Sequence, residues 1–249
     1  MNTIHFLSQK FGLASGEYLA FLRILEMENW TKSWGFSGLV GEWNCEVWGG
    51  HSNKIQERFN RLIEVLELIL PLLNSLHRLH KAYIDINLLG EEVQLNGTIK
   101  EVGFFEDLAL DATSLNDLVS ALKKVTQNYP HCLVTKVDIE LDTMVLEDSG
   151  IIILPNSSNL FLGMDNKAEI DQEVNVNIYV CFSTYIDVWL KKTFNENGLL
   201  RDNQEASKRN HPHLKKFLQG LEESLQVQLK VGESRYYSKY LHRTGFIDI

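Results

Sequence analysis

Three carboxylates alternate along one short segment of the chain, Val137-Asp138-Ile139-Glu140-Leu141-Asp142. If this segment is a strand, Asp138, Glu140 and Asp142 project from one face, because successive strand side chains point to opposite faces. Like charges at that spacing destabilise a sheet unless a cation compensates them. A divalent metal ion does so through carboxylate oxygens. Basic side chains of a protein partner, or of this chain's own tail, would do so equally well, and a solvated strand face is the simplest alternative.

Aromatic residues gather in a second segment, residues 30–50, which holds four of the five tryptophans and five glycines. Tryptophan is enriched in binding hot spots because it is large, rigid and able to donate one hydrogen bond. The candidate partner-binding tryptophans are Trp30, Trp34, Trp43 and Trp48. The alternative is that they close one end of the core, and we expect at least one of them to be buried.

The third feature is a basic C-terminal part. Residues 190–249 carry 11 basic and 7 acidic side chains, whereas residues 1–189 carry 13 basic and 26 acidic ones. Guanidinium groups bind phosphate or carboxylate through two hydrogen bonds and stack on aromatic rings. The candidate anion-binding residues are Arg209, His211, His213, Arg235 and Tyr236. The alternative is that this basic part simply packs on the acidic body.

The sequence lacks the common short motifs of catalytic and cofactor-binding sites. It contains no glycine-rich phosphate loop, no GxSxG turn and no HExxH helix, so we expect no cofactor. His77 and His80 are three residues apart on a predicted helix and would share a face, but no third ligand follows clearly, so we expect no metal there. The three cysteines are far apart and odd in number, which argues against a disulfide framework.

Composition narrows the choice of partners and compartment. The chain has 249 residues and a formal net charge of −9, so most of its surface should repel nucleic acid. No secretory leader is recognisable, and no apolar run approaches the roughly 20 residues that a membrane span needs. We therefore expect a cytoplasmic protein that contacts neither membrane nor nucleic acid. The oligomeric state stays open.

Periodicity predicts the elements that must position these residues. Helical spacing of apolar residues predicts helices over residues 17–28, 53–85, 114–129 with Ser114 as cap, and 205–226, with a return to helix near Asp187. Pro71 should either kink the helix over residues 53–85 or start a second one. Alternation predicts strands over residues 43–47, 93–95, 98–102, 135–146, 150–154, 160–163, 173–182 and 225–231. Asn96-Gly97 should form a hairpin turn, and residues 155–159 a second turn.

The order of helices, then strands, then helices favours an α+β fold. We expect an antiparallel β meander of four or more strands, packed by N-terminal and C-terminal helices. No linker composition interrupts the chain, so residues 1–249 are predicted to form a single domain. A subdivision into a helical part, residues 1–85, and a part with the sheet and C-terminal helices, residues 86–249, is the alternative.

Two hypotheses for the function follow. The first is a non-enzymatic, cytoplasmic protein that binds a basic protein partner through its acidic surface, for example an immunity or inhibitor protein that neutralises a nuclease-type toxin. The second is a metal-dependent hydrolase or nuclease-like enzyme, in which Asp138, Glu140 and Asp142 hold the cation and the basic tail receives an anionic substrate. We rank the binding protein first, because the second hypothesis depends on carboxylate spacing alone.

Overall fold

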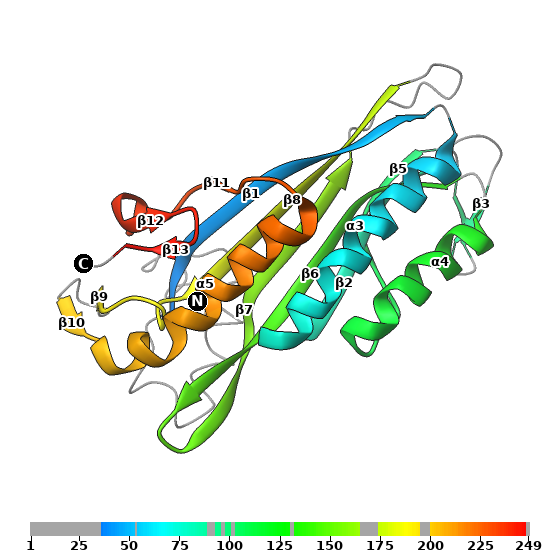
Figure 1. The fold of residues 1–249 in the computed structure, drawn as a ribbon. Coiled ribbons are helices and arrows are strands. Elements are labelled where there is room, and N and C mark those ends of the chain that lie inside the picture. The colour runs from blue at the N-terminus through cyan, green and yellow to red at the C-terminus, as the bar shows by residue number, and fades with distance from the viewer. Residues whose placement is uncertain are drawn as a thin grey trace, which may run out of the picture.

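A seven-stranded antiparallel sheet dominates the computed structural model (Figure 1). The structure describes residues 36–247 except 53, 89–92, 96–97, 101–102, 130–131, 165–173 and 195–199. In spatial order the strands of the sheet are β11 (Lys230–Val231), β1 (Phe36–Ser52), β8 (Val174–Ile186), β7 (Gly150–Met164), β6 (Cys132–Glu147), β2 (His77–Leu88) and β5 (Gly103–Ala109). Strands β6, β7 and β8 are consecutive neighbours, as in a meander.

Three α-helices and three small two-stranded sheets complete the described part of the chain. The helices are α3 (Ile55–Leu76), α4 (Leu118–Asn128) and α5 (Gln204–Leu225), with short 3-10 turns at Leu115–Asp117 and Ser238–Tyr240. The small sheets pair β3 (Val93–Leu95) with β4 (Thr98–Lys100), β9 (Lys192–Phe194) with β10 (Leu200–Asp202), and β12 (Leu241–His242) with β13 (Gly245–Phe246). This mixture of helices with a large antiparallel sheet confirms the α+β class.

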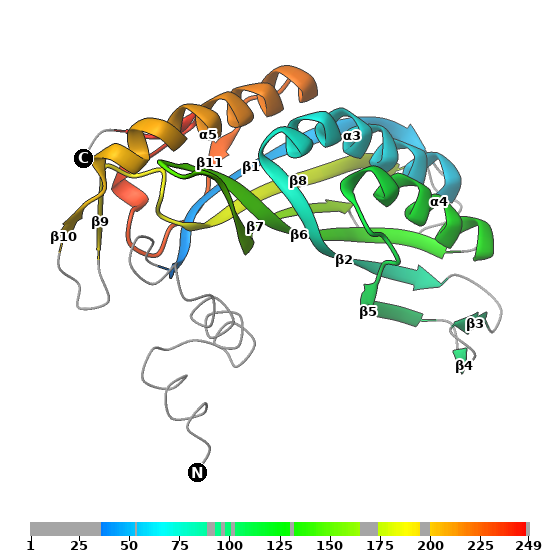
Figure 2. The ribbon, with the colours of Figure 1, turned by 90° about the horizontal axis from the view of Figure 1, so that it is seen from below.

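The helices α3, α4 and α5 lie along the same face of the sheet (Figure 2). Helix α3 buries Phe59, Leu62, Leu66, Ile69 and Leu73, which recur three or four residues apart. Fully burying one such side chain contributes about 1.5–3 kcal/mol. Helices α3 and α5 contact each other and β6. The predicted helix over residues 17–28 lies outside the described residues, so packing of the sheet by helices from both ends of the chain stays a prediction.

The C-terminal residues follow the edge of the sheet after α5. Strand β11 pairs with β1 at Trp43 and Asn44, and the backbone N–H of Arg235 donates to the carbonyl of Leu39. Tyr237 is buried. The basic C-terminal part therefore packs against the edge of the sheet. This agrees with the alternative that the basic part packs on the acidic body of the chain.

Several predicted elements are confirmed. The helices predicted over residues 114–129 and 205–226 appear as α4 and α5. The strands β3 and β4 on either side of Asn96-Gly97 pair antiparallel, but Asn96 and Gly97 themselves lie outside the described residues. Ser114 does occupy the N-cap position of the 3-10 turn Leu115–Asp117 that precedes α4, but its hydroxyl accepts no backbone N–H and instead donates to the Asp117 carboxylate. The strand predicted over residues 225–231 is reduced to Lys230–Val231.

The predicted long helix over residues 53–85 is wrong beyond Leu76. Pro71 lies inside α3 on its exposed side and does not end it. The chain instead becomes β2 at His77, which pairs with Thr143 of β6. Pairing with a distant strand has therefore overridden the local helical spacing. The alternative domain boundary near Ile86 falls inside β2.

Two predicted features between the later strands are also wrong. Residues 155–159 do not reverse the chain, because β7 runs through them as one strand with a bulge. Thr143 pairs with Leu154 and Leu141 with Ser158, so three residues of β7 lie opposite one residue of β6, and Asn156 takes a positive φ of 44°. The helix predicted near Asp187 is a turn between β8 and β9.

Candidate functional site

The candidate site is the sheet face turned away from the described helices, which we call the open face (Figure 2). On β6, Val137, Ile139 and Leu141 are buried towards the helices, so the side chains between them project from the open face. The open face comprises Glu42, Asn44, Glu46 and Trp48 of β1, Asn177, Tyr179, Cys181 and Ser183 of β8, Asn159, Phe161 and Gly163 of β7, Lys136, Asp138, Glu140 and Asp142 of β6, and Arg78, His80, Lys81, Tyr83 and Asp85 of β2.

Strand register arranges these side chains in rows across the sheet. One row runs through Lys81, Glu140, Asn159, Ser183 and Glu42. The row through Asp85, Lys136, Gly163, Tyr179 and Glu46 lies two rows away on the same face, beyond the row that contains Asp138. A Cβ atom on Gly163 would lie 2.7 Å from Cζ of Phe161, so the absence of a side chain there gives the Phe161 ring its place. The three carboxylates of β6 do share one face, as their alternation predicted.

Two of these three carboxylates are bound by the chain itself. The Asp138 carboxylate accepts a 2.6 Å hydrogen bond from Nδ2 of Asn159. The Asp142 carboxylate lies 2.9 Å from Nδ1 of His80 and accepts a 2.9 Å hydrogen bond from the backbone N–H of Asn156 in the β7 bulge. These contacts offset much of the repulsion that the carboxylate spacing would otherwise cause.

Lys136 is the cation at the centre of a second acidic group. Its Nζ lies 3.3 Å from Asp107, 3.6 Å from Asp85 and 3.6 Å from Asp138. Burial alone would lower the pKa of Lys136, but the hydrogen bond to Asp107 and the charges of Asp85 and Asp138 outweigh it and raise the pKa. The ammonium group is therefore held in its charged form. Sequence reasoning missed Lys136, although it precedes Asp138 in the same alternating pattern.

Glu140 differs from both of its neighbours. It is half-buried, yet it makes no hydrogen bond or ion pair to any residue that the structure describes. Desolvation raises the pKa of Glu140, the charges of Asp138 and Asp142 raise it further, and His80 and Lys81 oppose the rise. Because its negative charge is half-buried and only partly compensated, Glu140 would be stabilised by an additional cation.

The described residues give no support to a metal site. Among them, no group of three His, Cys, Asp or Glu side chains is placed to hold a metal ion. His77 and His80 lie on β2 and not on a helix; His77 is buried, whereas His80 reaches Asp142 on the open face. Of the three carboxylates whose spacing suggested a metal-dependent hydrolase, Asp138 and Asp142 are bonded to other residues of the chain. Glu140 has no such bond to a described residue.

The four tryptophans of residues 30–50 have different environments. Trp43 is fully buried: its Nε1 donates a 2.7 Å hydrogen bond to the carbonyl of His242, and its ring contacts Phe182 and Phe246. Trp43 is therefore wrong as a partner-binding residue, because no partner can reach it. Trp48 is 68% exposed, near the end of β1. Trp30 and Trp34 lie outside the described residues.

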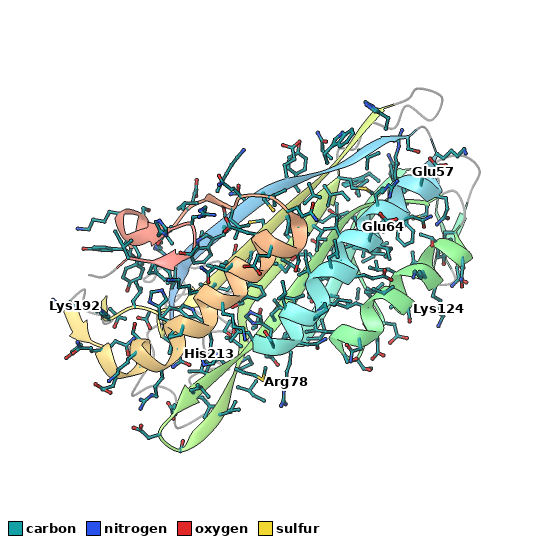
Figure 3. The ribbon with its side chains drawn as sticks, in the orientation of Figure 1. Glu57, Glu64, Arg78, Lys124, Lys192 and His213 are labelled. Carbon is teal, nitrogen blue, oxygen red and sulfur yellow. The ribbon has the colours of Figure 1, made fainter. Side chains whose placement is uncertain are left out.

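The five candidate anion-binding residues do not share one set of contacts. Arg209 pairs with Asp148 in the β6–β7 turn, and the guanidinium of Arg235 lies 5.2 Å from the ring centre of Tyr236. His211 lies beside Gly245, and His213 is exposed on α5 (Figure 3). These contacts support internal packing of the basic tail and do not assemble an anion site.

One further contact of the tail was missed by sequence reasoning. Arg243 donates two hydrogen bonds, of 2.6 and 2.7 Å, to the two carboxylate oxygens of Glu222 in α5. Both bonds come from one guanidinium nitrogen, Nη1, so the pair is charge-assisted but does not use the two-nitrogen fork of arginine. Nothing in the local sequence connects these two residues, because the contact arises from the return of the tail along α5.

The three thiols are poorly suited to nucleophilic chemistry. Burial raises the pKa of Cys45 to about 11 and the pKa values of Cys132 and Cys181 to about 12. The reactive form of cysteine is the thiolate, which is scarce at neutral pH for such groups. We assign these cysteines no part in the candidate site.

Comparison of the chain with protein-family models, with curated proteins and with solved structures finds no match. None of the helices in the described residues combines the length and apolar character needed to cross a membrane. The site must therefore be interpreted from its own chemistry.

Proposed function

We propose that this chain is a non-enzymatic binding protein whose open face docks a basic protein partner. The observation that carries the proposal is Glu140, a half-buried carboxylate with no direct partner among the described residues. A lysine or arginine from a partner would compensate this charge. Charge-assisted hydrogen bonds of this kind are roughly twice as strong as neutral ones.

The organisation around Glu140 supports a binding role over a purely structural one. The side chains of Asp138 and Asp142, on either side of Glu140, are fixed by their contacts with Asn159 and His80. The net charge of −9 accelerates encounter with a cationic surface, and this steering weakens as salt rises. A broad, rigid sheet face suits a folded partner, because little ordering is needed on binding.

A concrete form of this proposal is an immunity or inhibitor protein that acts in the cytoplasm against a nuclease-type toxin. Proteins that bind nucleic acid present lysines and arginines towards phosphates. An acidic face that covers those side chains blocks access of the nucleic acid. The proposal involves no cofactor and no membrane.

The experiment that tests the proposal is affinity capture from host lysate at low and at high salt, with mass spectrometry of the retained proteins. We expect a basic protein that is retained at low salt and reduced at high salt. Immobilised Glu140→Gln chain should retain less of it. Glu223→Gln, which removes one charge from an exposed position on α5, is the matched control and should retain as much as the unchanged chain. Absence of any basic protein at low salt would contradict the proposal.

A further inference from the structure

We infer that the open face contains a subsite that prefers arginine to lysine, formed by Trp48, Tyr179 and Glu46. This inference deepens the proposed function and rests on it, because the subsite would receive one side chain of the basic partner. The three residues come from neighbouring strands, β1 and β8, and lie at the end of the open face away from Arg78 and Asp142.

The strand register brings the three residues together. Glu46 lies directly opposite Tyr179, and Trp48 lies directly opposite Asn177, which is two residues from Tyr179. Trp48 and Tyr179 are therefore diagonal neighbours on one face. Diagonal positions are about 7–8 Å apart, within reach of aromatic side chains.

Exposure distinguishes this cluster from the other aromatic residues of the sheet. Trp48 is 68% and Tyr179 40% exposed, whereas Trp43, five residues before Trp48 on the same strand, is fully buried. The ring of Trp48 meets His51 edge-on, with 5.9 Å between ring centres. Large exposed aromatic groups on a rigid element are typical of the central residues of protein interfaces.

Glu46 supplies the charge that the subsite needs. It is exposed and has no hydrogen bond or ion pair within the described part of the chain. Lys230 is the nearest basic residue by register, opposite Asn44, and it forms no ion pair with Glu46. A cation delivered to Glu46 by a partner therefore displaces no internal contact.

The combination of two rings and one carboxylate favours a guanidinium over an ammonium group. A guanidinium is planar, stacks on tryptophan or tyrosine, and can donate two parallel hydrogen bonds to one carboxylate. An ammonium group is more strongly hydrated and has no planar fork. An arginine lying on Trp48 can reach Glu46, because these two side chains lie on the same face of β1 while Val47, between them, points to the opposite face.

The subsite and Glu140 can be covered by one partner. They are separated by three strand spacings and by four residues along the strand direction, which corresponds to roughly 20 Å. A standard interface buries about 800 Å² on each partner and extends over a comparable distance. The two positions can therefore be tested separately within one interaction.

The test uses two synthetic peptides of equal length and charge, one of arginine and one of lysine, titrated into the full chain by calorimetry at low salt. We expect the arginine peptide to bind more tightly. Trp48→Ala should weaken binding of the arginine peptide about three- to tenfold, the range expected for a lost cation–π contact, and should leave the lysine peptide nearly unchanged. Trp48→Phe should restore part of the preference.

Tyr236→Ala is the matched control, because Tyr236 is an exposed aromatic residue of the C-terminal segment and not of the open face. Equal binding of the two peptides, or an equal response of both to Trp48→Ala, would overturn the subsite. Glu140→Gln tests the underlying proposal independently, since it should weaken both peptides alike. If the unchanged chain shows no preference for the arginine peptide but Glu140→Gln weakens both peptides, the subsite alone is refuted. If the arginine peptide is preferred but Glu140→Gln changes the binding of neither peptide, the role of Glu140 alone is refuted.

Discussion

Glu140 and its two carboxylate neighbours show how differently three residues of one pattern can be used. Asp138 and Asp142 have hydrogen-bonding neighbours from β7 and β2, and Glu140 has none among the described residues. A position that costs stability in the isolated chain, yet lies at the centre of a surface, is typical of a binding residue. Stability and binding should therefore respond in opposite directions to its replacement.

The first prediction concerns Glu140→Gln. Because the folded-state pKa of Glu140 is raised, its ionised form is disfavoured by folding, and the chain loses stability as pH rises through that pKa. Removing the charge should raise the free energy of unfolding at pH 7 by up to about 1 kcal/mol, since the group is only half-buried. Urea unfolding at pH 7 checks this. A purely structural role for Glu140 would instead make the variant less stable.

The second prediction concerns His77, which is fully buried between β2, β6 and α5. Its Nδ1 lies 3.3 Å from the Thr143 hydroxyl, its Nε2 has no partner in the described structure, and its ring contacts Phe182 and Phe217. Burial lowers the pKa of His77 to about 3, against an ordinary value of 6.5. The unfolded chain therefore binds a proton that the folded chain excludes. The resulting stability is present above pH 6.5 and is lost as pH falls from 6.5 towards 3.

The measurement for His77 is urea unfolding at pH 7, 6 and 5, compared with the variant His77→Leu. The slope due to this single group approaches about 1.4 kcal/mol per pH unit. The variant should lose that part of the slope, while carboxylate titration, shared by both chains, cancels in the comparison. Parallel pH profiles of the two chains would show that His77 is not excluded from protonation as its burial implies.

At the scale of elements, the sheet shows which parts of a sequence prediction can succeed. Strand alternation in β6 and helical spacing in α4 and α5 are local patterns, and both predicted their elements correctly. The partners of Asp138 and Asp142 could not be predicted, because they depend on the register of β6 with β2 and β7. Pairing of His77 with Thr143 of β6 also explains why α3 ends at Leu76. Pairing of β7 with β6 explains why residues 155–159, predicted as a turn, form a bulge instead.

The third prediction tests the contact between β1 and the C-terminal segment. A Cβ atom on Gly41 would lie 2.6 Å from Trp43, 2.9 Å from Leu241 and 2.9 Å from Phe246. Gly41→Ala should therefore overpack this contact and destabilise the chain by about 1–3 kcal/mol. Thermal unfolding measures the loss, and hydrogen exchange should show faster exchange in β12 and β13. Gly150→Ala, at a position where no atom lies within 4 Å of the added carbon, shows the cost of a positive φ alone. Equal exchange of β12 and β13 in both variants would contradict the packing account.

At the scale of the whole molecule, the charge asymmetry of the sequence has two different consequences. Part of it is compensated internally, because Arg209 of the basic part, residues 190–249, pairs with Asp148 of the acidic part, residues 1–189. The pair of Arg243 with Glu222 lies within the basic part itself. On the open face, Glu46 and Glu140 form no ion pair with any described residue. Composition could predict the asymmetry, but only the fold shows which charges are already compensated.

The central claim is that the open face binds a basic partner, and it is tested most directly by reversing one charge on each side of the molecule. Glu140→Lys places a cation on the open face, and Glu223→Lys places the same cation on α5. Both chains are immobilised in the lysate capture at low salt, after urea unfolding has shown that both are folded. We predict that Glu140→Lys loses the basic partner and that Glu223→Lys retains it. Equal retention by the two variants would contradict the claim.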